Sequence, residues 1–96
     1  MTKKPATRRW DATNYLQSGA DMVAYLEAAL AEGDAALVAA ALGDIARAKG
    51  MSQLSRDTGL GRESLYKSLS ENGNPELGTV LNVLQALGLR LHAAAL

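Results

Sequence analysis

Apolar side chains recur at every third or fourth position along most of this chain, and a glycine follows almost every such stretch. This spacing is typical of helices that bury one face, and a glycine beyond the last turn adopts the left-handed conformation that ends a helix. The pattern predicts helices over residues 20–31, 35–49, 52–58, 62–70 and 77–86, with a short helical turn over 10–16. Asp34 and Ser52 should cap the second and third of these helices. The expected buried stripes include Val23, Leu30, Leu37, Leu77 and Leu81. We therefore expect an all-α fold of five to six helices.

The composition supports helices over a sheet. The 96 residues include no Phe and one Trp, so the core must consist of Leu, Ala, Val, Met and Ile, which suit closely packed helices. A chain of this length supports one small domain. It has no Cys, which excludes disulfides and thiolate metal ligands and fits a reducing cytoplasm. No apolar run approaches the length that spans a bilayer, so we expect a cytoplasmic protein without a membrane partner.

The two ends of the chain differ from this helical pattern. Residues 1–10 lack apolar periodicity and carry four cations, Lys3, Lys4, Arg8 and Arg9. We predict a basic, flexible tail over 1–10 and a single domain over 11–96. Residues 89–93 alternate apolar and polar side chains, which predicts a short C-terminal strand. A lone strand leaves its backbone unpaired, so it needs a partner from a second copy or from another protein.

Charge is unevenly distributed although the formal net charge is zero. Residues 11–46 hold six Asp or Glu and no Lys or Arg, whereas residues 47–70 hold five cations and two acids. An acidic first half joined to a basic segment suggests two partners of opposite charge. The alternative is that the sign of the charge simply varies between helix surfaces.

Residues 52–69 have the pattern of a helix, a tight turn and a second helix, as in helix-turn-helix DNA-binding units. The first helix must end on a residue with positive φ, and Gly59 meets this demand. Ser55 is small enough for the point where the two helices touch. The apolar anchors that should point inward are Leu54, Leu60, Leu65 and Leu69. An ordinary helical hairpin is the alternative interpretation of the same pattern.

A helix inserted in the major groove contacts base edges with residues near its N-terminus. Arg62 would then pair with guanine, and Glu63 would accept from the amino group of cytosine, unless Glu63 is a surface residue that phosphate repels. The amides and side chains at the start of the preceding helix would contact phosphates. The predicted DNA-binding residues are Ser52, Gln53, Arg56, Arg62, Glu63, Ser64, Tyr66, Lys67, Asn72 and Asn74.

Nothing in the chain indicates an enzyme. His92 is the single histidine, so neither a metal site nor an acid–base pair can be built around it. The glycines do not match a phosphate-binding loop. We expect no cofactor, no metal and no catalytic residue.

Several stretches resemble a known family. They are Tyr25-Leu26, the run from Ala41 to Leu54 (ALGDIARAKGMSQL), Thr58-Gly59-Leu60, Glu63-Ser64-Leu65-Tyr66, Asn72-Gly73-Asn74-Pro75 and Leu87-Gly88-Leu89-Arg90-Leu91. Over more than four-fifths of its length the chain is similar to the HigA-type addiction-module antidotes, antitoxins of the Xre/Cro-like helix-turn-helix class. It departs from them at Ser55, where Ala is usual, at Gly61, where a Ser or Thr cap is usual, and at Gly78, where a helix former is common.

This resemblance implies a lambda-repressor-like domain that binds operator DNA as a homodimer and represses its own operon. It also implies a RelE/ParE-like toxin that the protein neutralises as a type II antitoxin. We expect the dimer to form through the last helix and the C-terminal strand. A basic toxin should dock on the acidic half, at Asp21, Glu27, Glu32, Asp34 or Asp44. The alternatives are a stand-alone Cro-like regulator without a toxin, and an interaction module that has lost DNA binding.

Overall fold

The computed structural model describes residues 15–96, which form five helices and no strand. The helices are α1 (Gly19–Glu32), α2 (Ala35–Lys49), α3 (Met51–Thr58), α4 (Arg62–Ser68) and α5 (Leu77–Ala86). The all-α class is confirmed for this part of the chain, and every boundary lies within two residues of its prediction. The predicted tail over 1–10 and most of the helical turn over 10–16 lie outside the described residues.

Side chains next to the helices determine where α1 and α2 begin. The Ser18 hydroxyl accepts from the Asp21 N–H (3.1 Å), and the Asp21 carboxylate accepts in return from the Ser18 N–H (3.1 Å). This capping box satisfies two amides that have no partner inside the helix. At α2, the Asp34 carboxylate accepts from the Ala36 N–H (2.9 Å), as predicted. Gly33, at φ 68°, ends α1 in the predicted left-handed conformation.

The junction between α2 and α3 is sharper than predicted. Gly50 adopts φ 116°, and Met51, the next residue, already begins α3 and is buried. The prediction that Ser52 caps α3 is therefore wrong, because Ser52 lies inside the first turn and the helix start has no side-chain cap. The positive φ at Gly50 turns the chain so abruptly that Met51 enters the core directly.

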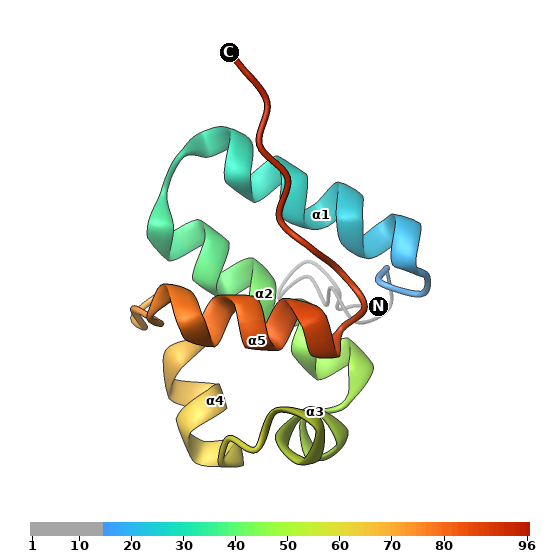
Figure 1. The fold of residues 1–96 in the computed structure, drawn as a ribbon, viewed down its shortest axis with the longest axis vertical. Coiled ribbons are helices and arrows are strands. Elements are labelled where there is room, and N and C mark those ends of the chain that lie inside the picture. Colours follow the sequence, from blue (N-terminus) through green and yellow to red (C-terminus); the bar gives the residue numbers. More distant parts are fainter. Residues whose placement is uncertain (1–14) are drawn as a thin grey trace, which may run out of the picture.

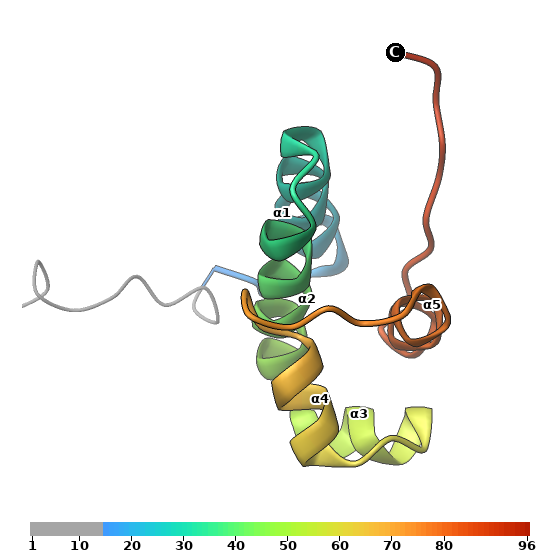
Figure 2. The same ribbon diagram turned by 90° about the vertical axis from the view of Figure 1, so that its left-hand side faces the viewer.

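The core lies where α2 and α3 meet their neighbours. α2 packs against α1, α3 and α4, and α3 also packs against α4 and α5. The most deeply buried side chains of this core are Leu42, Ile45, Leu54, Leu65, Leu69, Val83 and Leu84. In Figure 1, α3 and α4 lie at one end of the long axis, and α1 and the C-terminus lie at the other. Figure 2 shows that α5 and the C-terminal segment lie to one side of α1 and α2.

Several apolar side chains that the helical spacing placed in the core are exposed instead. The expected buried stripes included Val23 and Leu30 on α1, Leu37 on α2, and Leu77 and Leu81 on α5, and all five are 42–66% exposed. Each of α1 and α5 packs closely against only one other helix, so a narrower stripe than predicted is covered. The described chain thus leaves much apolar surface open, which is typical of an interaction surface.

The predicted C-terminal strand, which needs a partner from another chain, does not form in the single chain. After α5, Gly88 adopts φ 78° and the Leu89 N–H donates to the Leu84 carbonyl (2.8 Å). Residues 90–96 continue in an irregular, exposed course and make no backbone hydrogen bond within residues 15–96. The alternating pattern forms no strand here because this part of the chain contains no other strand to pair with it.

Candidate nucleic-acid interface

α3 and α4 are joined by residues 59–61, and the connection is held by specific hydrogen bonds. Gly59 ends α3 at φ 77°, as its position predicted. The Ser55 hydroxyl donates to the Leu60 carbonyl (2.5 Å), and the Leu60 N–H donates to the Thr58 hydroxyl (3.2 Å). The Asn82 amide of α5 donates to the Thr58 carbonyl (3.2 Å). The angle between α3 and α4 is therefore held by the turn itself and by α5.

The four predicted anchors point inward. Leu54, Leu65 and Leu69 are almost fully buried, and Leu60 is half-buried against the same core. These contacts fix one face of each short helix and leave the opposite face to solvent. All ten predicted DNA-binding residues are exposed: Ser52, Gln53, Arg56, Arg62, Glu63, Ser64, Tyr66, Lys67, Asn72 and Asn74. Eight of them lie on α3 and α4 at one end of the molecule, whereas Asn72 and Asn74 lie in the turn before α5, and contact of all ten with DNA stays a prediction.

The outer face of α4 carries charges that the described chain does not use. Arg62 and Lys67 lie on the exposed side of this helix, with Glu63 beside Arg62. None of the three makes a hydrogen bond or ion pair with any residue from 15 to 96. Two cations without an internal partner are available to an anionic ligand, whereas Glu63 would face phosphate unfavourably unless it meets a base amino group. Gly61 begins the helix without a side-chain cap, as its sequence position suggested.

α3 presents a hydrogen-bonded row of polar side chains on its exposed face. The side-chain amide of Gln53 donates through Nε2 to the Asp57 carboxylate (2.8 Å). Its Oε1 atom accepts from the Arg56 guanidinium (2.8 Å). This arrangement orients Arg56 and Gln53 before any ligand binds. Sequence reasoning missed Asp57, although its spacing of four residues from Gln53 could have indicated the pair.

The turn after α4 completes the exposed face. A Cβ atom at Gly73 would lie 2.1 Å from the Ser68 carbonyl oxygen and 2.5 Å from that of Lys67, so this turn packs directly on the end of α4 and requires glycine. Asn72 and Asn74, on either side of it, remain exposed. The turn therefore places two amide side chains beside the C-terminal end of α4.

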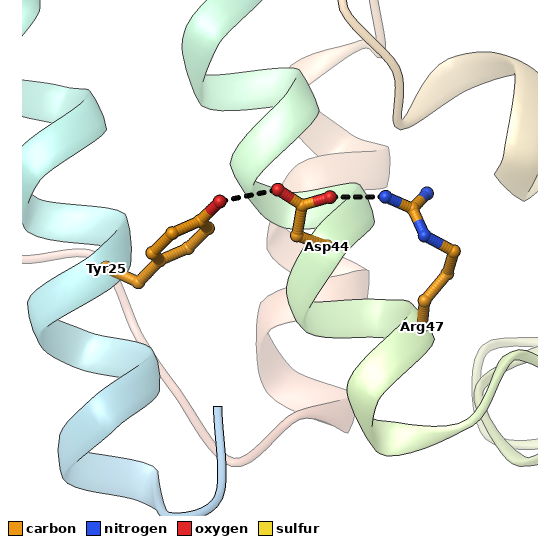
Figure 3. Close-up of polar contacts among 3 residues, drawn as sticks. All are labelled: Tyr25, Asp44 and Arg47. Atoms are coloured by element: carbon orange, nitrogen blue, oxygen red, sulfur yellow. Dashed lines mark hydrogen bonds and ion pairs between the residues drawn. The ribbon is translucent and has the colours of Figure 1, made fainter. Parts of the chain in front are cut away.

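The acidic residues predicted to meet a toxin do not form one free patch. Asp21 belongs to the capping box and Asp34 caps α2. Asp44 accepts a hydrogen bond from the Tyr25 hydroxyl (2.6 Å) and forms an ion pair with Arg47 (Figure 3). Only Glu27 and Glu32 make no hydrogen bond or ion pair within residues 15–96. Three of the five predicted carboxylates therefore already stabilise this fold.

The Tyr25–Asp44–Arg47 contact joins α1 to the last turns of α2. Burial, the hydrogen bond to Asp44 and the negative charge of that carboxylate together raise the pKa of Tyr25 to about 12, with burial the largest cause, while Arg47 opposes the shift. Tyr25 is therefore a neutral donor at physiological pH. Sequence reasoning treated Asp44 as a surface charge and missed this contact, because its partner lies nineteen residues away.

The described part of the chain offers little for catalysis. No cluster of three His, Cys, Asp or Glu side chains that could hold a metal ion occurs within residues 15–96. His92, the one histidine, is exposed beyond α5. Over the same residues, none of the helices combines the length and apolar character that crossing a membrane requires. What the described residues do present is an exposed polar helix face, which suits binding.

Comparison with known proteins agrees with a binding role. Residues 6–95 match the model of a family described as probable addiction module antidote proteins. The chain is also 47% identical over 83 residues to a protein of Haemophilus influenzae that is described as uncharacterized, and the match covers 86% of each chain. No solved structure matches this chain. The family match spans nearly the entire sequence, and the chain therefore belongs to the addiction module antidote family.

Proposed function

We propose that this protein is the antitoxin of a type II toxin–antitoxin module and a cytoplasmic autorepressor of the HigA type. An antidote implies a toxin partner, and the toxin that the sequence resemblance indicates is RelE/ParE-like. In this proposal, α3 and α4 form an Xre/Cro-like helix-turn-helix that binds the operator of the module. The surface that binds toxin lies at the end of the molecule that carries α1.

The observation that carries DNA binding is the outer face of α4. Arg62 and Lys67 project to solvent without partners in the described chain, while Leu65, on the same helix, anchors it in the core. A short helix held in this way presents its N-terminal residues to the base edges of the major groove. Exposed amides at the start of α3 and the amide side chains after α4 would contact phosphates on either side.

We propose that the protein binds as a homodimer through α5. Leu81 is 47% exposed on this helix, and a second copy would cover it. A two-fold axis at α5 would place two α4 helices on one face, and half-sites of such dimers lie about one helical turn apart, roughly 34 Å. The C-terminal segment forms no strand in the single chain, so the proposed interface is based on α5.

Binding to fragments of the module's own promoter tests the DNA-binding part. Arg62→Ala should weaken binding to the cognate operator by about 1–3 kcal/mol per half-site, because a bidentate contact with guanine is lost. Arg90→Ala removes the same charge at the opposite end and serves as the matched control. An equal loss of operator affinity in both variants would contradict the assignment of Arg62 to a base contact. The absence of salt-sensitive operator binding by the wild type would contradict DNA binding itself.

Neutralisation of a toxin is tested separately. The chain is expressed together with the product of the adjacent gene, and co-purification and rescue of growth are measured. Operator binding without a toxin would favour a stand-alone Cro-like regulator. Toxin binding without operator binding would favour an interaction module that has lost its DNA function.

A further inference from the structure

An open groove separates α1 from the C-terminal segment, which consists of residues 89–96. Two adjoining hollows of about 280 and 390 Å³ form it, and both are lined by Leu30 and Leu91. The first lies between α1 and the C-terminal segment and also has Val23 and Glu27 in its wall. The second continues between α2 and the start of α5, past Val38, Asn74 and Leu77. The C-terminal segment passes in front of α1 in Figure 1, and Figure 2 shows that it stands off to one side of it. We call this feature the α1 groove.

The α1 groove is lined by large apolar side chains that nothing in the described chain covers. Val23 is 44% exposed, Leu30 42% and Leu91 40%. Covering such side chains contributes about 25 cal/mol for each Å² removed from water. The C-terminal wall also offers the N–H and C=O groups of residues 90–96, which make no backbone hydrogen bond within the described chain. An occupant would thus gain both apolar contact and backbone hydrogen bonds.

The charge of the α1 wall indicates what kind of occupant fits. α1 carries Asp21, Glu27 and Glu32 and no Lys or Arg. Glu27 lines the groove and has no partner within residues 15–96, whereas Asp21 is engaged in its capping box. A cation placed over the groove would therefore meet an unpaired carboxylate. A second copy docked through α1 would instead bring two acidic helices together.

We propose that the α1 groove binds a segment of the toxin that presents apolar side chains flanked by Lys or Arg. This inference rests on the proposed antitoxin function and gives its toxin-binding surface a location. Val23, Leu30 and Leu91 provide the apolar contact, and Glu27 pairs with a cation of the partner. The surface differs from the five-carboxylate patch expected from the sequence, because Asp21, Asp34 and Asp44 are engaged within the fold.

The test measures the affinity of the chain for the purified product of the adjacent gene. Leu30→Glu places a carboxylate on the apolar floor, and Glu27→Lys reverses the charge of the wall. Each should weaken toxin binding at least tenfold and leave operator binding unchanged. Leu37→Glu, at an equally exposed leucine that lines neither hollow, and Glu71→Lys, at an exposed acid beyond α4, are the matched controls and should retain toxin affinity.

Three results would overturn the proposal in distinguishable ways. Wild-type toxin affinity in both groove variants would show that the toxin binds elsewhere, with the antitoxin function intact. Conversion of the Leu30→Glu variant from dimer to monomer would assign the groove to a second copy. A wild-type chain that binds no product of the adjacent gene would refute the antitoxin function itself, and with it the occupant proposed here. Because Glu27 is exposed, its variant remains informative even if Leu30→Glu fails to fold.

Discussion

Replacing Gly43 with alanine tests how closely α2 approaches the DNA-facing helix pair. Gly43 is buried in α2, and a Cβ atom there would lie 2.0 Å from the carbonyl oxygen of Leu69, at the end of α4. Since an ordinary contact needs about 3.4 Å, α2 and the end of α4 must separate by about 1.4 Å. Both sides of this contact are backbone, so no flexible side chain can move away to relieve it.

The expected loss of stability follows from two opposing effects. Overpacking of this kind costs about 1–3 kcal/mol, and a backbone collision belongs at the upper end of that range. Alanine recovers about 1 kcal/mol because glycine disfavours a helix interior. We therefore expect the free energy of unfolding to fall by about 2 kcal/mol, and Tm to fall by about 8–16 °C for a domain of this size. Operator affinity should also fall, because α4 is displaced.

Gly78→Ala is the matched control, because it is the same substitution in another helix of the same chain. A Cβ atom at Gly78 meets nothing within 4 Å, so only helix propensity changes and stability should rise by about 0.5–1 kcal/mol. Urea unfolding monitored by circular dichroism at 222 nm gives both values. Equal stabilisation by the two substitutions would refute the close approach of α2 to the end of α4.

Two further predictions concern side-chain hydrogen bonds. The raised pKa of Tyr25, about 12, means that the folded state holds this proton more tightly than the unfolded chain does. The stability that the protonated Tyr25 contributes is fully present below pH 10 and is lost as the pH rises through 12. The free energy of unfolding, measured from about pH 9 to 12, should therefore fall more steeply for the wild type than for Tyr25→Phe. Parallel curves would contradict the Asp44 contact. Ser55→Ala should lower the free energy of unfolding by about 1 kcal/mol, because the Leu60 carbonyl loses its donor. Ser64→Ala, at an exposed serine of α4, should change it little, and an equal effect of both would count against the turn hydrogen bond.

Local signals in the sequence were sufficient to predict the helices and the turn between α3 and α4. Gly59 lies where a positive φ is needed, and Leu54, Leu65 and Leu69 are buried as their spacing required. Asp34 caps α2 as predicted. These features depend on neighbours within a few residues, so the pattern of the chain contains them. The exposure of the predicted DNA-facing side chains follows from the same spacing.

Features that depend on contacts between distant segments could not be predicted in this way. Helical periodicity placed Val23 and Leu30 in the core, yet it does not specify how many neighbours α1 has. Likewise, the acidity of α1 and α2 was visible, but the contact of Asp44 with Tyr25 requires the two helices to be packed first. For this reason the sequence indicated a set of five carboxylates as the candidate toxin surface, whereas the structure indicates a groove with one free carboxylate.

The positions of the two candidate surfaces determine how the two proposed partners can influence each other. α3 and α4 lie at the opposite end of the long axis from α1, and neither helix contributes a residue to the α1 groove, although Asn74 borders it. A toxin segment in the groove therefore leaves Arg62 and Lys67 uncovered. Direct competition between toxin and operator is therefore not expected from this arrangement. One route for a mutual effect passes through α2, which packs against both α1 and α4. Its polar link to α1 is the contact of Asp44 with Tyr25, and Arg47, the other partner of Asp44, lies one turn from Gly43, where α2 meets the end of α4. Tyr25→Phe should consequently alter the effect of toxin on operator affinity more than it alters either affinity measured alone.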